Sequence, residues 1–187
     1  GLKTAIVSNG FINQKPLEKL IPWSDAANID LKSFKEETYR KVLKGSLKPV
    51  LETIELLNKE KVWLEVTTLL VTQMNDSKEE IEMIAEYLAK TDRSIPWHIS
   101  RFYPAGRMTE KRPTEEKVLL EAFETGKDKG LKYVYLGNMR SDERSETICP
   151  ECGVTVIRRS GFTVMEYGLK SGGACPVCGK RIEGRFN

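Results

Sequence analysis

The sequence has little of several features that would place it quickly in a class. It contains one histidine, four cysteines and a net charge of only +3. This charge is small and sparse, without interleaved aromatic residues, so a nucleic-acid surface is not expected. No run of about eighteen apolar residues is present, which argues against a membrane-spanning helix. Residues 1–20 have no apolar block before a small-residue cleavage site, so we expect no secretory signal there.

What is present fits one globular domain with a small appendage. Apolar residues make up 40% of the 187 residues and charged residues 30%. All four cysteines fall in one pattern near the C-terminus, which is typical of a reducing compartment, and we expect a cytoplasmic protein. The pattern predicts two domains, residues 1–138 and residues 139–187.

Stretches of strand length alternate with stretches of helical periodicity before the cysteines. Such alternation predicts an α/β fold with right-handed crossovers and a parallel sheet. Because a closed eight-stranded barrel normally needs about 250 residues, we expect part of a (β/α) barrel or a small open sheet. The expected strands are residues 4–8, the stretch around Asp30, and residues 62–71, 96–104 and 132–137; the expected helices are 16–21, 35–43, 48–60, 78–90 and 114–129.

The stretch 26–33 combines the pattern of a buried strand with two opposite charges at its end. Asp30 and Lys32 stand two residues apart, so they point to the same face. A charge that faces a core is costly unless it is paired or bound to a ligand. Ligands of parallel α/β sheets and barrels bind at the carboxyl ends of the strands. We therefore expect Asp30 and Lys32 to mark a ligand-binding edge.

The cysteines form two copies of one motif. Cys149 and Cys152 lie in C-P-E-C-G, Cys175 and Cys178 lie in C-P-V-C-G, and 22 residues separate the pairs. Each C-x-x-C turn points two thiolates at one centre, and the following glycine permits the tight turn. Four thiolates complete a tetrahedral site that suits Zn²⁺, in a zinc-ribbon-like β module with a hairpin over residues 154–167. A rubredoxin-like iron site has the same geometry and stays open as an alternative. Disulfides are less favoured in a reducing compartment, and a fully ligated site indicates a structural role.

The ends of the expected strands carry a further set of short motifs. In their order, and together with the Cys-Pro-x-Cys-Gly pair, they resemble radical S-adenosylmethionine (SAM) enzymes of the pyruvate formate-lyase-activating type, and most of all the AmmeMemoRadiSam-system radical SAM proteins. The motifs are Ser8-Asn9-Gly10, Asp30-Leu31-Lys32, Val66-Thr67-Thr68-Leu69, and the stretch from His98 to Pro104.

The resemblance implies a partial (β/α)₆ barrel that holds a [4Fe–4S] cluster and SAM. Cleavage of the SAM sulfonium in such enzymes gives a 5′-deoxyadenosyl radical, which abstracts a hydrogen atom. The protein positions the cofactor and excludes water. The substrate, a protein glycine or a small molecule, is not defined by these residues. The implied cofactor contacts are Ser8 and Asn9 on the third barrel strand, Asp30 and Lys32 on the fourth, Thr67 or Thr68 on the fifth, and Tyr103 on the sixth.

Two residues of the sixth strand have alternative roles. The activating enzymes carry a histidine near the end of this strand, and the best register places Tyr103 there. The single histidine, His98, lies five residues earlier, and we expect it to be structural. Arg101 is a candidate contact for a substrate carboxylate, or else a solvent-facing arginine.

The cluster-binding C-x₃-C-x₂-C segment and the Gly-Gly-Glu stretch of the family are absent from these residues. The chain begins without Met and enters a strand almost at once, so we expect a fragment that is inactive in radical chemistry as it stands. Two alternatives stay open: a zinc-ribbon binding module on an α/β scaffold, and a scaffold subunit that pairs with another chain. An open strand edge at residues 4–8 predicts self-association.

Overall fold

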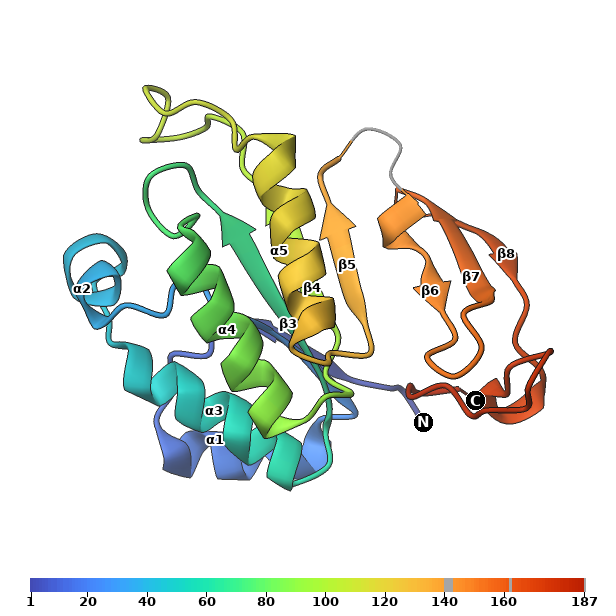
Figure 1. Cartoon of the computed structure of the whole chain (residues 1–187). Helices are drawn as coiled ribbons and strands as arrows, with labels where there is room; N and C mark the ends of the chain where they lie inside the picture. The colour runs from blue at the N-terminus through green and yellow to red at the C-terminus, as the bar shows by residue number, and fades with distance from the viewer. Residues whose placement is uncertain (140–142, 162, 187) are drawn as a thin grey trace.

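The computed structural model describes residues 1–139, 143–161 and 163–186. A five-stranded parallel sheet has the strand order β1-β2-β3-β4-β5, and a three-stranded antiparallel sheet has the order β6-β7-β8. Figure 1 shows the helices along one side of the larger sheet and the smaller sheet beside β5. The expected parallel α/β portion with a small C-terminal β module is therefore confirmed.

Strands and helices alternate along the larger sheet as the hydrophobic pattern predicts. Helical crossovers join each strand from β1 to β4 to the next parallel strand and return the chain to the same end of the sheet. The strands are β1 (Ala5–Ser8), β2 (Ala26–Asp30), β3 (Trp63–Leu70), β4 (Trp97–Arg101) and β5 (Val134–Gly137). The helices are α1 (Gln14–Leu20), α3 (Leu47–Lys59), α4 (Lys78–Thr91), α5 (Glu116–Asp128), and the short α2 (Glu36–Thr38), which continues as a π-helical turn (Tyr39–Leu43).

The core lies between the helices and one face of the larger sheet. Alternate residues of the strands, among them Ile29, Val66 and Trp97, are fully buried there. Ile54 of α3 and Ile84 of α4 belong to the same core cluster. Because side chains alternate across a strand, the remaining residues of β2, β3 and β4 point to the opposite face, which the helices do not cover.

Tertiary contacts involve capping residues of two helices, and α5 starts two residues later than the expected 114–129, whereas α4 starts at Lys78 as expected. Thr114 does not cap the helix that follows it; its buried hydroxyl donates to the Leu70 carbonyl oxygen at 2.5 Å, and α5 begins at Glu116. Ser77 caps α4 by accepting from the Glu80 amide, and the Glu80 carboxylate accepts from the Phe34 amide at 2.9 Å instead of from the amide of Ser77. In both cases a distant backbone group replaces the local capping partner.

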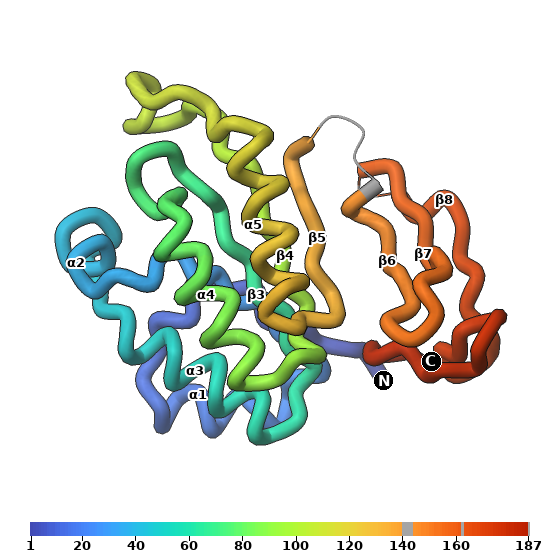
Figure 2. The backbone as a smooth tube through the Cα atoms, viewed as in Figure 1, coloured from blue at the N-terminus to red at the C-terminus, as the bar shows by residue number. Residues whose placement is uncertain are grey.

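The C-terminal module has strands β6 (Thr147–Ile148), β7 (Thr155–Ser160) and β8 (Thr163–Tyr167). It packs a small core of its own, which includes Tyr133, the residue before β5. The backbone tube in Figure 2 shows the C-terminal end returning close to the N-terminus. Within the described residues, no helix combines the length and the apolar character needed to cross a bilayer.

Candidate functional site

Polar side chains occupy the face of the larger sheet that the helices leave uncovered. In the register of the parallel strands, Asp30 pairs with Thr67, and Thr67 pairs with His98. His98 in turn pairs with Tyr135. Paired residues of neighbouring strands point to the same face and lie about 4.8 Å apart. Asp30, Thr67, His98 and Tyr135 therefore form one line across four strands, which we call the polar row.

A cleft of 770 Å³ lies between this face and the C-terminal module. Thr67, His98 and Tyr135 of the polar row line one wall, and Thr147 and Arg159 of the module line the other. A cleft of several hundred Å³ with a few convergent polar groups is typical of a small-molecule site. Further polar residues of the sheet wall are Asn28, Glu65 and Ser100.

His98 and Glu65 form the central contact of the sheet wall. His98 Nε2 lies 2.8 Å from Glu65 Oε2, and Trp63 Nε1 donates to Glu65 Oε1 at 3.0 Å. The His98 ring stacks on Tyr135 with 5.1 Å between ring centroids. Because an ionised carboxylate can only accept, Nε2 of His98 carries the proton. A neutral His98 then presents Nδ1 as an acceptor, and a protonated His98 presents it as a donor.

The Glu65 carboxylate is stabilised in its charged form. Burial alone raises the pKa of this carboxyl, but the hydrogen bonds from His98 and Trp63 and the charges of His98 and Arg159 outweigh burial. The net pKa of Glu65 is below its ordinary value. The sheet wall therefore carries a persistent negative charge that is satisfied by its neighbours.

The two walls are joined by direct contacts. The Tyr135 hydroxyl lies 3.1 Å from Thr147 Oγ1, and Arg159 Nη1 donates to the same Thr147 oxygen at 2.9 Å. Deeper in the interface, Glu183 accepts from Lys132 and from the Tyr133 hydroxyl, each at 2.5 Å. These contacts hold the module against the sheet, so the cleft is a feature of the folded chain.

Asp30 and Lys32 lie at the carboxyl end of β2, beside the cleft. Lys32 Nζ contacts Asp30 Oδ2 at 2.8 Å, and both side chains are 38% exposed. The expectation that the two residues share one face is confirmed. They pair with each other and reach solvent on the open face, so neither is buried in the core.

Hydrogen bonds from three side chains, Asn75, Glu80 and Tyr39, hold the loop after β2. Asn75 is fully buried and donates to the carbonyl oxygens of Lys32 and Leu69 at 2.7 and 2.9 Å. Glu80, also fully buried, accepts from the Ser33 hydroxyl at 2.5 Å. Buried polar groups of this kind give a loop a single conformation. Lys32 is therefore presented from a rigid support.

The Tyr39 hydroxyl supports the same loop. It accepts from the Lys32 amide at 3.3 Å. Burial, which outweighs this hydrogen bond, raises the pKa of Tyr39 to about 12. The phenol is therefore neutral at ordinary pH and adds no charge beside Asp30.

Ser8 and Asn9 end β1 in a compact turn. Ser8 Oγ accepts from the Gly10 amide at 3.1 Å, and Asn9 Oδ1 accepts from the Phe11 amide at 3.0 Å. Gly10 has φ +69, and a Cβ there would lie 2.7 Å from Ile29 Cγ2, so only glycine fits this turn. Ser8 and Asn9 thus lie at the same end of the sheet as Asp30, but they do not line the cleft.

The structure distinguishes the two adjacent threonines of β3. Thr67 faces the cleft, and its hydroxyl donates to Asn28 Oδ1 at 2.8 Å. Thr68 is fully buried on the helix side, where its hydroxyl donates to the Leu31 carbonyl oxygen and accepts from Trp97 Nε1, both at 3.0 Å. Of the two, Thr67 is the one placed to meet a ligand.

Tyr103 and Arg101 lie away from the cleft wall. Tyr103 follows the end of β4, and its hydroxyl donates to the Asn138 carbonyl oxygen at 3.1 Å. Arg101 bonds the Thr114 carbonyl oxygen at 2.8 Å and forms an ion pair with Glu116 at 2.7 Å. Neither lines the cleft, whereas His98 does. Contact of Tyr103 with a cofactor stays a prediction.

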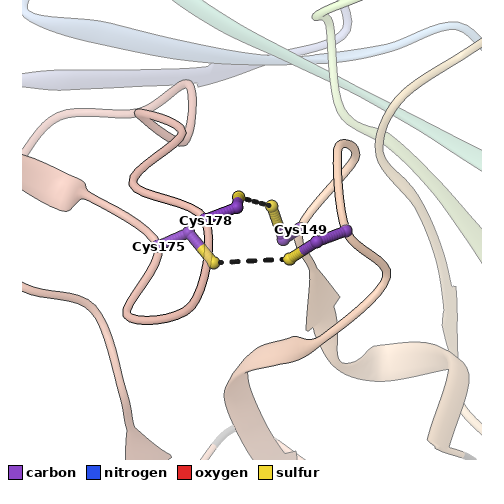
Figure 3. A group of neighbouring side chains, drawn as sticks. Cys149, Cys175 and Cys178 are labelled. Atoms are coloured by element: carbon purple, nitrogen blue, oxygen red, sulfur yellow. Dashed lines mark hydrogen bonds between the residues drawn. The ribbon is translucent and has the colours of Figure 1, made fainter.

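The four cysteine sulfurs form a second site in the C-terminal module. All four lie within 4.8 Å of one another, and the closest pairs, Cys149 with Cys178 and Cys152 with Cys175, are 3.6 and 3.7 Å apart. Figure 3 shows Cys149, Cys175 and Cys178 pointing toward one centre. A tetrahedral ion with metal–sulfur bonds of about 2.3 Å requires sulfur–sulfur distances of about 3.8 Å. The cysteines are free thiols rather than disulfides, and their spacing fits Zn²⁺ or iron.

Both knuckles of this site share one hydrogen-bond pattern. The Gly153 amide donates to the Cys149 carbonyl oxygen at 2.9 Å, and the Gly179 amide donates to that of Cys175 at 3.0 Å. The amides of Cys178 and Val177 lower the pKa of the Cys175 thiol. A thiolate is the form that binds metal, and these two backbone amides stabilise that form at Cys175.

Sequence reasoning missed the sheet residues that complete the cleft. Asn28 and Glu65 each stand two residues before a residue of the polar row, so the period of two along β2 and β3 places them on the same face. Ser100 follows from the same alternation along β4, and Tyr135 follows from its register with His98. Arg159 carries no such signal, because its place depends on how the module docks.

A comparison of sequences finds a relative that is longer than this chain. No family model matches the chain. The chain is 37% identical over 185 residues to an uncharacterized protein of Methanocaldococcus jannaschii. This match covers 98% of the chain but only 55% of that protein, so the chain spans little more than half the length of its relative.

Two solved structures share the fold. A domain of pyruvate-formate lyase-activating enzyme from Bacteroides vulgatus matches with a TM-score of 0.63 and 16% identity, over 74% of this chain and 83% of that domain. SuiB from Streptococcus suis, bound to SAM, matches with a TM-score of 0.58 and 10% identity, over 73% of this chain and 33% of that protein. Structures of this group are radical SAM enzymes. The sheet and helices of this chain have their partial-barrel fold.

Proposed function

We propose that this chain is the C-terminal part of a radical SAM protein of the activating-enzyme type, closest to the AmmeMemoRadiSam-system proteins. The observation that carries the proposal is the polar row, which brings Asp30, Thr67 and His98 together on the open face of a parallel sheet. Asp30 is the last residue of β2, and open α/β folds bind ligands at the carboxyl ends of their strands. The partial-barrel fold of the solved relatives supports the same assignment.

In this proposal the chain's own residues bind and orient SAM. Asp30 and Lys32 offer one negative and one positive group at the rim, and Thr67 offers a hydroxyl beside them. When bound together, SAM and its iron–sulfur cluster supply a 5′-deoxyadenosyl radical. All four cysteines of this sequence belong to the site in the C-terminal module, so the residues present do not fit a [4Fe–4S] cluster. We therefore propose cofactor binding without radical formation for this chain.

The remaining parts of the proposal concern the module and the surroundings. The four-cysteine site holds zinc, or else iron, in a structural role, because four thiolates complete a tetrahedron. Free thiols at this spacing suit a reducing, cytoplasmic compartment. The substrate of the whole protein is a small molecule or a protein glycine.

Calorimetric titration with SAM tests the cofactor proposal. We expect measurable binding to the chain and a loss of about tenfold in affinity for Lys32→Ala, since a hydrogen bond to a charged group contributes about 1.5 kcal/mol or more. Lys41→Ala is the matched control, because Lys41 pairs with Glu37 on the surface, away from the polar row. The absence of SAM binding, or equal losses in both variants, would contradict the proposal.

A second candidate function is a metal-containing binding or scaffold module without cofactor chemistry. The hydrogen bonds of Glu183 with Lys132 and Tyr133, which hold the module against the larger sheet, favour it. Stoichiometric metal in a chain that does not bind SAM would support this candidate over the first.

A further inference from the structure

Two consecutive arginines on β7 point to different surroundings. Arg158 forms ion pairs with Glu146 at 3.0 Å and with Glu166 at 3.1 Å. Arg159 lines the cleft. A register shift, typical of a β-bulge, occurs between these two residues. Bulges re-aim side chains and are frequent beside functional sites.

The hydrogen bonds that hold the Arg159 guanidinium both come from one nitrogen, Nη1. Its Nη1 donates to the Ser145 carbonyl oxygen at 3.0 Å and to Thr147 Oγ1 at 2.9 Å. The guanidinium lies over the Tyr135 ring, 5.7 Å from the centroid. Among residues 1–139, 143–161 and 163–186, Nε and Nη2 have no hydrogen-bond partner. These two nitrogens form a planar edge that matches a carboxylate or phosphate.

The carboxylates of the cleft already have partners. Glu65 is engaged by His98 and Trp63, and Glu183 is engaged by Lys132 and Tyr133. Within the described part of the chain, neither carboxylate forms an ion pair with Arg159. The cleft thus contains satisfied negative charges and a fixed guanidinium with donors to spare.

We propose that Arg159 is the receptor for an anionic group, a carboxylate or a phosphate, on the ligand that fills the cleft. This inference rests on the proposed function in one respect, namely that the ligand is the substrate of the whole protein. The C-terminal module is then part of the substrate site, and it selects for substrates that carry an acid group. His98 stacks on the same Tyr135 ring and lines the same cleft, so it contacts the same ligand.

The chain's single histidine makes the test direct. We would follow the His98 ring signals by NMR while titrating inorganic phosphate and, separately, sodium acetate, at pH 7 and constant ionic strength. We expect a saturable shift with at least one anion, which also distinguishes a phosphate receptor from a carboxylate receptor. Arg159→Gln should weaken this binding about tenfold or more, since one charge-assisted pair is lost.

The controls separate binding from folding. Arg159→Gln keeps an amide donor for Thr147, and Arg159→Lys keeps the charge but loses the planar edge, so Arg159→Lys should retain weaker binding. Arg158→Gln removes the neighbouring charge outside the cleft and should leave the affinity within about twofold. Metal content and circular dichroism report whether each variant is folded.

Two results would overturn the inference: no saturable shift in the unaltered chain, or equal losses for Arg158→Gln and Arg159→Gln. SAM titration of the same samples keeps this inference distinct from the proposed function. If the unaltered chain binds SAM but neither anion, the proposed role of Arg159 is wrong and the proposed function stands. Anion binding without SAM binding defeats the proposed function and leaves an anion site.

Discussion

Glu65 connects most of the polar contacts on the sheet wall of the cleft. Its two oxygens accept from His98 and Trp63, and Arg159 lies near enough to influence its charge. A carboxylate with lowered pKa stabilises the fold above its ordinary pKa, near 4.5, and this contribution is lost as the pH falls through the folded-state pKa. Glu65 thus gives the cleft an acid-sensitive element.

Replacing this carboxylate tests the linkage. We expect Glu65→Gln to lower the free energy of unfolding by about 1 kcal/mol at pH 7, because a charged acceptor for His98 is lost. The difference from the unaltered chain should shrink as the pH falls below 4.5, where the unaltered chain must begin to protonate Glu65. Urea unfolding at several pH values measures the change in the free energy of unfolding and its dependence on pH. A difference that is constant with pH would refute the role of the charge.

At the scale of elements, the two knuckles depend on residues that follow the cysteines. Gly153 and Gly179 have φ values of +73 and +76, and no atom lies within 4 Å of an added Cβ. A side chain there would cost conformational energy rather than cause a clash. The glycines therefore fix the direction of the thiolates through backbone geometry.

We expect about one zinc or iron per chain, without labile sulfide, when the purified protein is analysed for metal. Gly179→Ala should weaken metal binding about fivefold to tenfold in a chelator competition, since the left-handed conformation costs an L residue about 1 kcal/mol or more. Gly161→Ala is the matched control, because Gly161 also has positive φ (+57) and open surroundings but follows β7, away from the sulfurs. Equal effects of both changes on metal affinity would refute the knuckle role.

At the scale of the whole molecule, the two edges of the larger sheet differ. Contacts between β5 and the turn Glu143–Ser145 bring the module against one edge. At the other edge, β1 pairs with β2, and within the described residues it has no second neighbour. Val7 in this strand is 80% exposed. An exposed apolar edge strand is a template for pairing with another chain.

We therefore propose that a second copy pairs along β1. Light scattering at high micromolar concentration should give about twice the mass of one chain. Val7→Lys should shift the mass toward the monomer, because a charge on an edge strand opposes strand pairing. A monomeric mass for the unaltered chain would count against self-association.

Part of the fold followed directly from local patterns. The run of β-branched and apolar residues at 62–71 predicted β3 within one residue at each end, because β propensity and period-two burial act together there. The start of α5 was mispredicted because Thr114 bonds the Leu70 carbonyl oxygen instead of capping its own helix. Local signals are overruled where a buried backbone group on another element needs a partner.

The candidate sites also contain features that local sequence determines and features that depend on tertiary contacts. The sequence alone determined the four-cysteine site, since a C-x-x-C-G turn sets the direction of two sulfurs within five residues. It also determined that Asp30 and Lys32 share a face, because alternation along a strand is local. Only the tertiary structure decided that Thr67 rather than Thr68 meets the cleft, that His98 pairs with Glu65, and that Arg159 of the module lines the same cleft. The physical reason is that these contacts join residues from different strands, 33 positions apart for His98 and Glu65, and their geometry depends on strand register and on module docking, which no local pattern encodes.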